Sequence, residues 1–314
     1  MGQAAPQILG CMKADIRIGI SGWRYPPWRG TFYPKGLAQS RELQYASRAL
    51  PAIEINSSFY ALQTPARFEK CAADTPEDFR VTVKAPRFIT HILRLQDPAS
   101  AMANFVASGL FALGEKLGAV LWQFPPSMKF DPDQFEAFLK LLPHSAAEAA
   151  ALAVRREPRM HDKELLSPPE GHAMRHAIEV RHDSFPCPAF VALLRKYKAA
   201  LVIADTGGRW PEFEDITADF VYLRLHGANQ TYESGYSDEQ LEHWAARIGC
   251  WSQGRQVNDA KLISDVAAPT RSARDVFCFF DNTMKVKAPE NARRLLSLLG
   301  LERGLPKLQS VPEH

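Results

Sequence analysis

Short apolar runs rich in Val, Ile, Leu and Phe recur along the chain, and longer stretches with helical character separate them. This alternation is typical of βα units and predicts a parallel sheet. Eight runs fit the pattern, at residues 16–21, 52–56, 80–84, 119–123, 177–181, 201–205, 222–226 and 276–282. Eight parallel strands with helices between them predict an α/β fold that is a single (β/α)8 TIM barrel rather than an open sheet.

Polar and apolar residues alternate within several of these runs. Ile53 and Ile55 flank Glu54, for example, and Asn56 follows. Side chains alternate across a strand, and the outward set of a barrel packs under the helices, so we expect the polar set to point inward. Followed to the last residue of each run, the alternation predicts a polar ring at the C-terminal mouth: Ser21, Asn56, Lys84, Gln123, Arg181, Asp205, His226 and Asn282.

A second charged layer is expected below this ring, formed by Arg17, Glu54, Glu179 and Arg224. One interpretation is a structural salt-bridge network that fills the barrel interior. The other is a set of functional charges, because barrel enzymes place their chemistry at the C-terminal mouth. The sequence leaves both open for the lower layer and favours function for the ring.

Several longer motifs follow or include the strand ends. They are GISGWRYPPWRGTFYP (19–34), EINSSFY (54–60), VKAPRFITH (83–91), LWQFPP (121–126), EVRHDSF (179–185), VYLRLHGANQTYESGY (221–236) and FFDNTMKVKAPENA (279–292). In these motifs, and in their order, the chain resembles the YecE-like family, a domain-of-unknown-function family. The resemblance implies a TIM barrel and brings no agreed substrate. Shape similarity to sugar isomerases and barrel endonucleases is only an analogy.

Cationic residues converge on the predicted mouth. They come from three strand ends and the loops after them, a pattern that suits a phosphate, carboxylate or oxyanion, and they are Lys84, Arg87, His91, Arg181, His182, Arg224 and His226. We expect Glu179 to transfer a proton and His226 to be a second acid or base. Lys84 is expected to clamp an anion or to act as a Schiff-base nucleophile, with an ion pair to Glu54 or Glu179 as the structural alternative.

Further candidates are neutral or aromatic. Trp23, in the first βα loop, can form a wall against a flat or sugar-like ligand, although such aromatics equally often pack under a long loop. Tyr60, Tyr232 and Tyr236, with Asn56 and Asn282, offer donors for a hydroxyl-rich ligand or caps for loops. With Ser21, Gln123 and Asp205 they complete the predicted ligand-binding set.

No metal or cofactor is expected. Glu179, Asp205, His182 and His226 raise the metal question, but H-x-H and H-E-x-x-H spacings are lacking and nearby cations would repel a metal ion. The first loop lacks both G-x-G-x-x-G and G-x-x-x-x-G-K-[ST], which argues against nicotinamide and ATP. The five cysteines form no C-x-x-C pair and are expected to be reduced thiols.

Charge and hydropathy limit the classes of partner that the sequence favours. The 38 Lys and Arg against 35 Asp and Glu give a net charge of +3, which does not favour nucleic acid. No apolar run approaches the roughly 18 residues of a membrane span, and the first residues lack a signal-peptide pattern, so we expect a cytoplasmic protein without a membrane partner. The expected partner is an anionic small molecule, and the oligomeric state stays open.

The chain divides into a loose leader (1–14), one barrel domain (15–302) and a tail (303–314). Within the barrel, residues 143–176 form an extended connection between the fourth and fifth strands, favoured as a surface insertion over a lid. The leading hypothesis is an enzyme without redox cofactor that applies acid/base or hydrolytic chemistry to a phosphorylated or sugar-like anion. The alternatives are a nucleic-acid-binding or endonuclease-like protein and a barrel that only senses a ligand.

Overall fold

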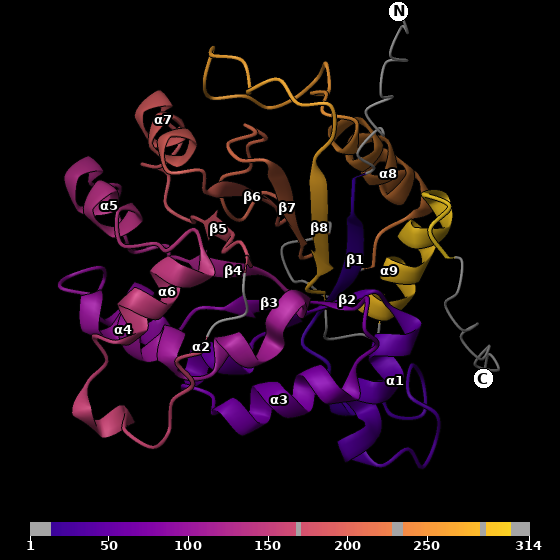
Figure 1. Cartoon of the computed structure of the whole chain (residues 1–314). Helices are drawn as coiled ribbons and strands as arrows, with labels where there is room; N and C mark the ends of the chain where they lie inside the picture. The colour runs from indigo at the N-terminus through magenta and orange to yellow at the C-terminus, as the bar shows by residue number, and fades with distance from the viewer. Residues whose placement is uncertain (1–13, 168–170, 228–234, 283–286, 303–314) are drawn as a thin grey trace, which may run out of the picture.

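The computed structural model describes residues 14–167, 171–227, 235–282 and 287–302. Eight parallel strands pair in chain order and close into a barrel, with helices around its outside (Figure 1). The strands are β1 Ile16–Ser21, β2 Ala52–Ile55, β3 Arg80–Lys84, β4 Leu117–Gln123, β5 His176–Glu179, β6 Ala200–Asp205, β7 Phe220–Leu225 and β8 Asp275–Phe280. The predicted single TIM-type barrel is confirmed, and each expected run overlaps one of these strands.

The α-helices of the described residues are α1 Glu42–Ala49, α2 Ser57–Tyr60, α3 Pro65–Asp74, α4 Ala99–Ala107, α5 Pro132–Leu139, α6 Ala146–Ala153, α7 Pro188–Lys196, α8 Asp238–Ser252 and α9 Lys287–Leu298. Shorter turns are η1 Pro26–Trp28, η2 Gln39–Arg41, η3 Phe88–Ile92, η4 Leu110–Lys116 and η5 Pro158–Met160, of which η3 is a π-helical turn. The connection from β6 to β7, all of it described, contains no helix, contrary to the expected alternation.

Local sequence sets several helix starts. Proline stands at the first position of α3, α5 and α7, where the missing N–H costs nothing. Ser237 and Gln240 form a reciprocal capping box at α8. These signals turn the chain into helices that return it along the outside of the barrel.

Two apolar layers hold the barrel wall. Ile18, Ile53 and Leu223 belong to the outer core under the helices, whereas Ala52 and Tyr222 belong to the cluster that fills the lumen. Gly19 permits a close approach, because a Cβ there would lie 2.1 Å from the Ala52 carbonyl oxygen. The predicted alternation is therefore confirmed for the strands in which only one set of positions is apolar.

The predicted parity is wrong for β6 and β8. Val202 and Ala204 fill the lumen, so Asp205 is directed to the outer side of the wall. In β8 the lumen residues are Phe277 and Phe279. Both sets of positions in these strands are apolar, so alternation by residue type could not distinguish inside from outside.

The predicted layering also needs correction. Ser21 pairs with Glu54 in register, so it lies level with the charged layer and not above it. Arg17 binds Asp15 at the other end of the barrel. The stagger between neighbouring strands in a barrel, which sequence positions alone do not reveal, accounts for both differences.

The extended connection contains α6 and η5, and α6 packs on α4. It leads from the end of α5 into the start of β5, so the part of it that is described enters the barrel at the end opposite to the mouth. The expected leader and tail lie outside the described residues, except for Ala14. Within the described part of the chain, no helix has the length and apolar character needed to cross a membrane.

Candidate functional site

Arg224 lies at the centre of the barrel mouth and binds three carboxylates. Its Nη1 is 2.7 Å from Glu179 Oε2, and its Nη2 is 2.9 Å from Glu54 Oε1 and 2.8 Å from Asp281 Oδ2. Arg224 is 1% exposed and is fixed in β7, whereas its partners belong to β2, β5 and the residue after β8. We call these four residues the Arg224 cluster.

Neutral donors complete the cluster. Ser21 donates to Glu54 Oε1 and accepts a hydrogen bond of 3.1 Å from Arg224 Nη2. Tyr222 donates to Glu54 Oε2 at 2.7 Å, and its hydroxyl lies 2.9 Å from Thr82 Oγ1. Buried charges are tolerated when they are paired and hydrogen-bonded in this way.

The cluster sets the charge of its carboxylates. Burial opposes ionisation of Glu179, but Arg181 and Arg224 hold its pKa well below the usual range. Arg181 binds the other oxygen, with Nη2 2.6 Å from Glu179 Oε1. Burial likewise opposes ionisation of Asp281, and Arg224 with His226 keeps its pKa below the ordinary value.

Lys84 is the contrasting member of the mouth. It is 8% exposed, and its Nζ lies 4.2 Å from the ring centroid of Phe59. Among the described residues no carboxylate lies within 4.0 Å of this Nζ. Lys84 therefore does not form the ion pair with Glu54 or Glu179 that was the structural alternative. Burial, followed by repulsion from Arg224, lowers the pKa of Lys84 to about 8.

Two histidines lie near these charged groups. His226 is 3% exposed, and its Nδ1 lies 3.2 Å from Asp281 Oδ2. His91 belongs to the π-helical turn after β3, where its Nδ1 lies 2.8 Å from Thr90 Oγ1. Burial and the positive charge of Lys84 lower the pKa of His91 to about 4, so this ring is neutral at neutral pH.

The structure brings together most of the predicted mouth. Lys84, Glu179, Arg181, Arg224, His226, Ser21 and Asn56 belong to it, and Asn56 Nδ2 donates to Ser21 Oγ at 2.9 Å. Gln123, 5% exposed, lies beside Glu179 in the strand register. Arg181 also faces the ring of Trp210 at 5.7 Å.

Other predicted residues lie elsewhere. Asp205 is hydrogen-bonded to Tyr236, whose hydroxyl also accepts from Gly227 N at 3.0 Å. Asn282 donates to Asn291 Oδ1 of α9 at 3.0 Å. These three predicted site residues therefore anchor loops and a helix outside the lumen. For Asp205 and Asn282 the reason is that the parity expected for β6 and β8 was wrong.

Two more candidates remain apart from the Arg224 cluster, and a third is not among the described residues. Tyr60 is 74% exposed at the end of α2. His182 Nδ1 lies 2.9 Å from Ser184 Oγ in a local turn. Tyr232 lies outside the described residues.

Sequence reasoning missed Asp281 and Phe59. Asp281 is the residue that the corrected parity of β8 directs inward, and its charge directly after an apolar strand was the available signal. Phe59 had no comparable signal, since an aromatic residue on a short helix is usually core. For metals, no three His, Cys, Asp or Glu side chains group as ligands among the described residues.

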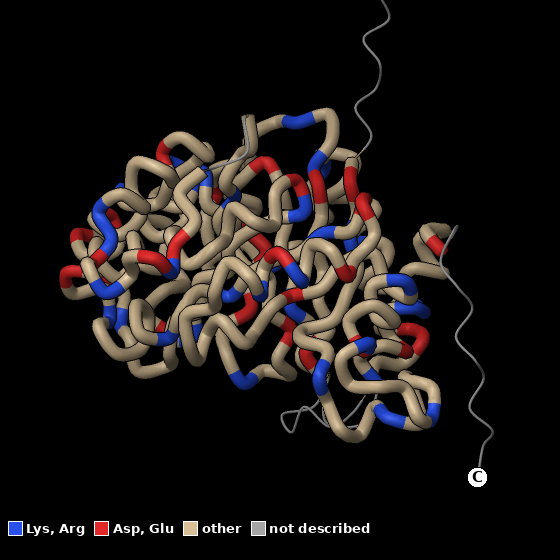
Figure 2. The backbone as a smooth tube through the Cα atoms, turned by 60° about the horizontal axis from the view of Figure 1, so that its bottom comes forward, with Lys and Arg blue, Asp and Glu red and all other residues tan. Residues whose placement is uncertain are grey.

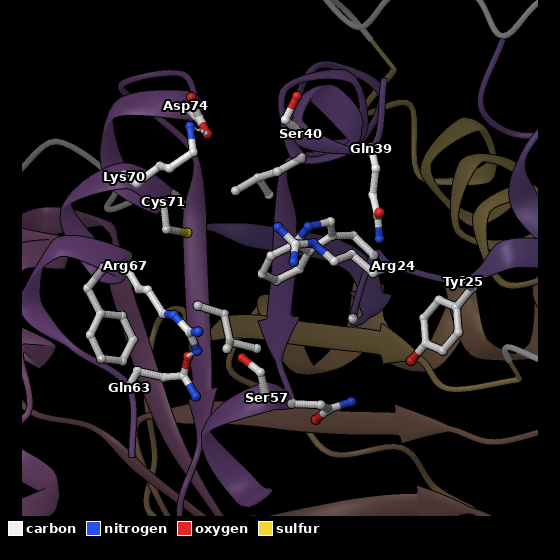
Figure 3. A pocket seen from close by; sticks show the side chains of 16 residues that line it. Arg24, Tyr25, Gln39, Ser40, Ser57, Gln63, Arg67, Lys70, Cys71 and Asp74 are labelled. Atoms are coloured by element: carbon white, nitrogen blue, oxygen red, sulfur yellow. Dashed lines mark hydrogen bonds and ion pairs between the residues drawn. The ribbon is translucent and has the colours of Figure 1, made fainter. Parts of the chain in front are cut away.

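A cavity of about 550 Å³ lies beside the mouth, between the loop after β1, the start of α1 and the helices α2 and α3 (Figure 3). We call it the side cavity. Trp23 and Asn56 are the predicted site residues that line it. The full lining is Gly22, Trp23, Arg24, Tyr25, Gln39, Ser40, Leu43, Ile55, Asn56, Ser57, Gln63, Arg67, Phe68, Lys70, Cys71 and Asp74.

Known proteins with similar sequence and fold span almost the whole chain. The UPF0759 protein YunF of Bacillus subtilis (strain 168) is 24% identical over 308 residues, which cover 91% of this chain and 95% of YunF. A crystal structure of a DUF72 family protein from Thermotoga maritima MSB8 is 24% identical, covers 91% of this chain and 99% of its own, and superposes with a TM-score of 0.65.

A DUF72 family protein from Enterococcus faecalis V583 is 18% identical and covers 94% of this chain and 99% of its own, with a TM-score of 0.66. At these sequence identities, similarity to the two crystal structures supports the fold alone. The family model described as "Protein of unknown function DUF72" matches residues 17–314. The chain therefore belongs to the DUF72 family, in agreement with the YecE-like resemblance of its strand-end motifs.

Proposed function

We propose that the barrel mouth is the active site of an enzyme without redox cofactor that acts on an anionic, phosphorylated or sugar-like small molecule by acid/base chemistry. The observation that carries this proposal is Lys84. It is almost fully buried and has no carboxylate within 4.0 Å among the described residues, although three carboxylates lie nearby in the Arg224 cluster. A cation held in this state suits an incoming anion.

Lys84 has two roles in the proposal. The neutral fraction that a pKa of about 8 allows accepts a proton from the substrate, and the ammonium group formed by that transfer then pairs with the anionic group of the substrate. His226 is the second acid or base, because Asp281 orients its Nδ1 in the way that a carboxylate orients a catalytic imidazole.

Glu179 has a different role in the proposal from the proton transfer suggested by the sequence. Both of its oxygens accept from arginines, and its lowered pKa makes it a weak base. We assign to it the positioning of Arg181 and Arg224, of which Arg181 is the more exposed and is available to the substrate.

Binding of nucleic acid is less well supported. A nucleic-acid site needs a basic track along the surface and an affinity that falls steeply with salt. On the face shown in Figure 2, basic and acidic residues are interspersed. The near balance of 38 basic and 35 acidic residues agrees with that distribution.

The test is a turnover screen of sugar phosphates and related anions, with consumption followed by mass spectrometry. We expect the parent to convert at least one compound, with a pH–rate profile that bends near the Lys84 pKa of about 8. Lys84→Met should abolish conversion. Lys163→Met, at an exposed lysine of the extended connection, should convert it at the parent rate.

Other outcomes reject the proposal. Stabilisation of the parent by a compound that it never converts would indicate a ligand-sensing barrel, and a ligand in about hundredfold excess over its Kd should stabilise by about 3 kcal/mol. Conversion that survives in Lys84→Met would remove Lys84 from the chemistry. Salt-sensitive binding of an oligonucleotide without turnover would favour the nucleic-acid alternative.

A further inference from the structure

The side cavity holds more positive charge than its own residues neutralise. Arg24, Arg67 and Lys70 line it together with a single carboxylate, that of Asp74. Asp74 Oδ2 lies 2.9 Å from Lys70 Nζ, and its Oδ1 accepts from Gln44 Nε2 at 3.0 Å. The carboxylate of Asp74 is therefore already paired with Lys70 and Gln44.

The two arginines have no carboxylate partner. Arg67 Nη1 donates to the neutral Gln63 Oε1 at 3.0 Å, and within the described residues neither Arg24 nor Arg67 has a carboxylate within 4.0 Å. Figure 3 shows both side chains directed into the cavity from its two sides, Arg24 from the loop after β1 and Arg67 from α3. Neither positive charge is neutralised inside the cavity, so the two guanidinium groups together favour an anion there.

The remaining walls suit a flat ring. Trp23, Leu43, Ile55 and Phe68 provide apolar surface, and polar side chains such as Ser57 provide neutral hydrogen-bonding groups. Burial raises the pKa of the Cys71 thiol to about 12, so this wall adds no negative charge. The volume of about 550 Å³ lies inside the range of roughly 300–1,000 Å³ that small-molecule sites occupy.

We propose that the side cavity is a second binding site, separate from the barrel mouth, for a small molecule that carries a phosphate group and a planar ring. A phosphate suits this cavity better than a carboxylate, because its three terminal oxygens and nearly two charges match two guanidinium groups. A carboxylate is satisfied by one bidentate arginine. The ring packs on the apolar wall formed by Trp23 and its neighbours.

The test uses AMP as the probe, with calorimetric titration of the full chain. We expect AMP to bind in a one-to-one complex, and adenosine and ribose 5-phosphate to bind at least about tenfold more weakly, since each lacks one half of the recognised group. Arg24→Gln and Arg67→Gln should each weaken AMP binding about tenfold or more. Both side chains are exposed, so the variants should fold as the parent does.

Two controls separate this site from others. Arg155→Gln removes the same charge from an exposed position outside the cavity and should bind AMP like the parent. Lys84→Met should also bind AMP like the parent, so that loss of function at the mouth and loss of this site are distinguishable. Arg67→Lys, which keeps the charge and loses the planar fork, should lie between the parent and Arg67→Gln.

Four results would overturn the proposal. AMP does not bind at all, or it binds equally well to the parent and both glutamine variants, as a weak general attraction to positive charge would. Alternatively, AMP binding is lost in Lys84→Met and kept in Arg67→Gln, which places it at the mouth. If benzoate binds as tightly as AMP, with the same dependence on Arg67, then the cavity recognises a carboxylate and not specifically a phosphate.

Discussion

At the scale of single residues, Lys84 has its properties because β3 ends where the lumen is already filled with paired charges. Glu54 and Glu179 are nearby, but each is held by Arg224. The lysine therefore loses hydration without gaining an ion pair, and its pKa is lowered to about 8.

This pKa has a measurable effect on stability. Between about pH 8 and about pH 10.5 the unfolded chain binds a proton at Lys84 that the folded chain does not, so folding stability rises with pH in this interval. Below about pH 8 the folded protein carries the full cost of burying a protonated Lys84. The lowering of its pKa from 10.5 to about 8 corresponds to about 3 kcal/mol. Lys84→Met should raise the free energy of unfolding by up to this amount at neutral pH.

The measurement is urea denaturation of parent and Lys84→Met at several pH values. The gain in the free energy of unfolding should shrink as the pH rises from about 8 to about 10.5. Lys163→Met should differ from the parent by no more than about 0.5 kcal/mol throughout. A gain at Lys84 that does not change with pH would contradict the assigned pKa.

Residue types in the sequence predicted much of this site. Glu54, Lys84, Glu179 and Arg224 were identified because each alternates with β-branched or other apolar neighbours on its strand. Asp281 was not, because every residue of the preceding strand except its first is apolar. Ion-pair partners and the low pKa of Lys84 depend on distances between strands, which no single strand encodes.

At the scale of secondary-structure elements, α7 ends on an unfavourable residue. Lys198 has φ of 52° just past the helix, and Ala199 N donates to Leu194 O at 3.0 Å. This is the position and bond of a Schellman cap, where glycine is preferred because a Cβ is strained at positive φ.

Lys198→Gly should therefore stabilise the protein by about 0.5–1 kcal/mol, after the loss of the lysine's interaction with the helix dipole. The measurement is the urea midpoint, compared with Ala192→Gly at an exposed position inside α7. That control should lose about 1 kcal/mol, because glycine is a poor helix former. If both variants shift the midpoint in the same direction, the cap assignment fails.

Strands were more predictable from sequence than helices and turns. A period of two within a short apolar run identifies a strand locally, and all eight were found. The π-helical turn at Phe88–Ile92 has no such pattern, and Arg94, Leu95 and Asp97 directly after it have positive φ values, a conformation that residues with a Cβ rarely adopt.

At the scale of the whole molecule, the Arg224 cluster joins β2, β5 and β7 with the end of β8 across the lumen. Arg224→Met should cost about 3–5 kcal/mol at neutral pH, because it removes the cation that three carboxylates share and leaves the buried Glu54 without a counter-charge. In that variant the carboxyl groups bind protons more readily, so the loss should shrink as the pH falls towards about 5.

Chemical denaturation at about pH 7 and about pH 5 tests this expectation, with refolding at the lower pH if the variant is unstable at the higher one. Arg175→Met is the matched control, because its ion pair with Asp275 has side chains that are 29% and 28% exposed. That pair should be worth about 1 kcal/mol or less, with little change over this pH range. An Arg224→Met loss that grows as the pH falls would contradict the assigned charge states.

Around and below Tyr222 the lumen is filled by Phe220, Phe277, Phe279 and smaller apolar side chains. The interior formed by the eight described strands is therefore blocked beneath the Arg224 cluster. A molecule bound at the mouth must therefore enter and leave by the same opening, and a second molecule can bind only after the first has left. In a site with a single opening, slow release of one molecule limits the rate at which the next one can bind.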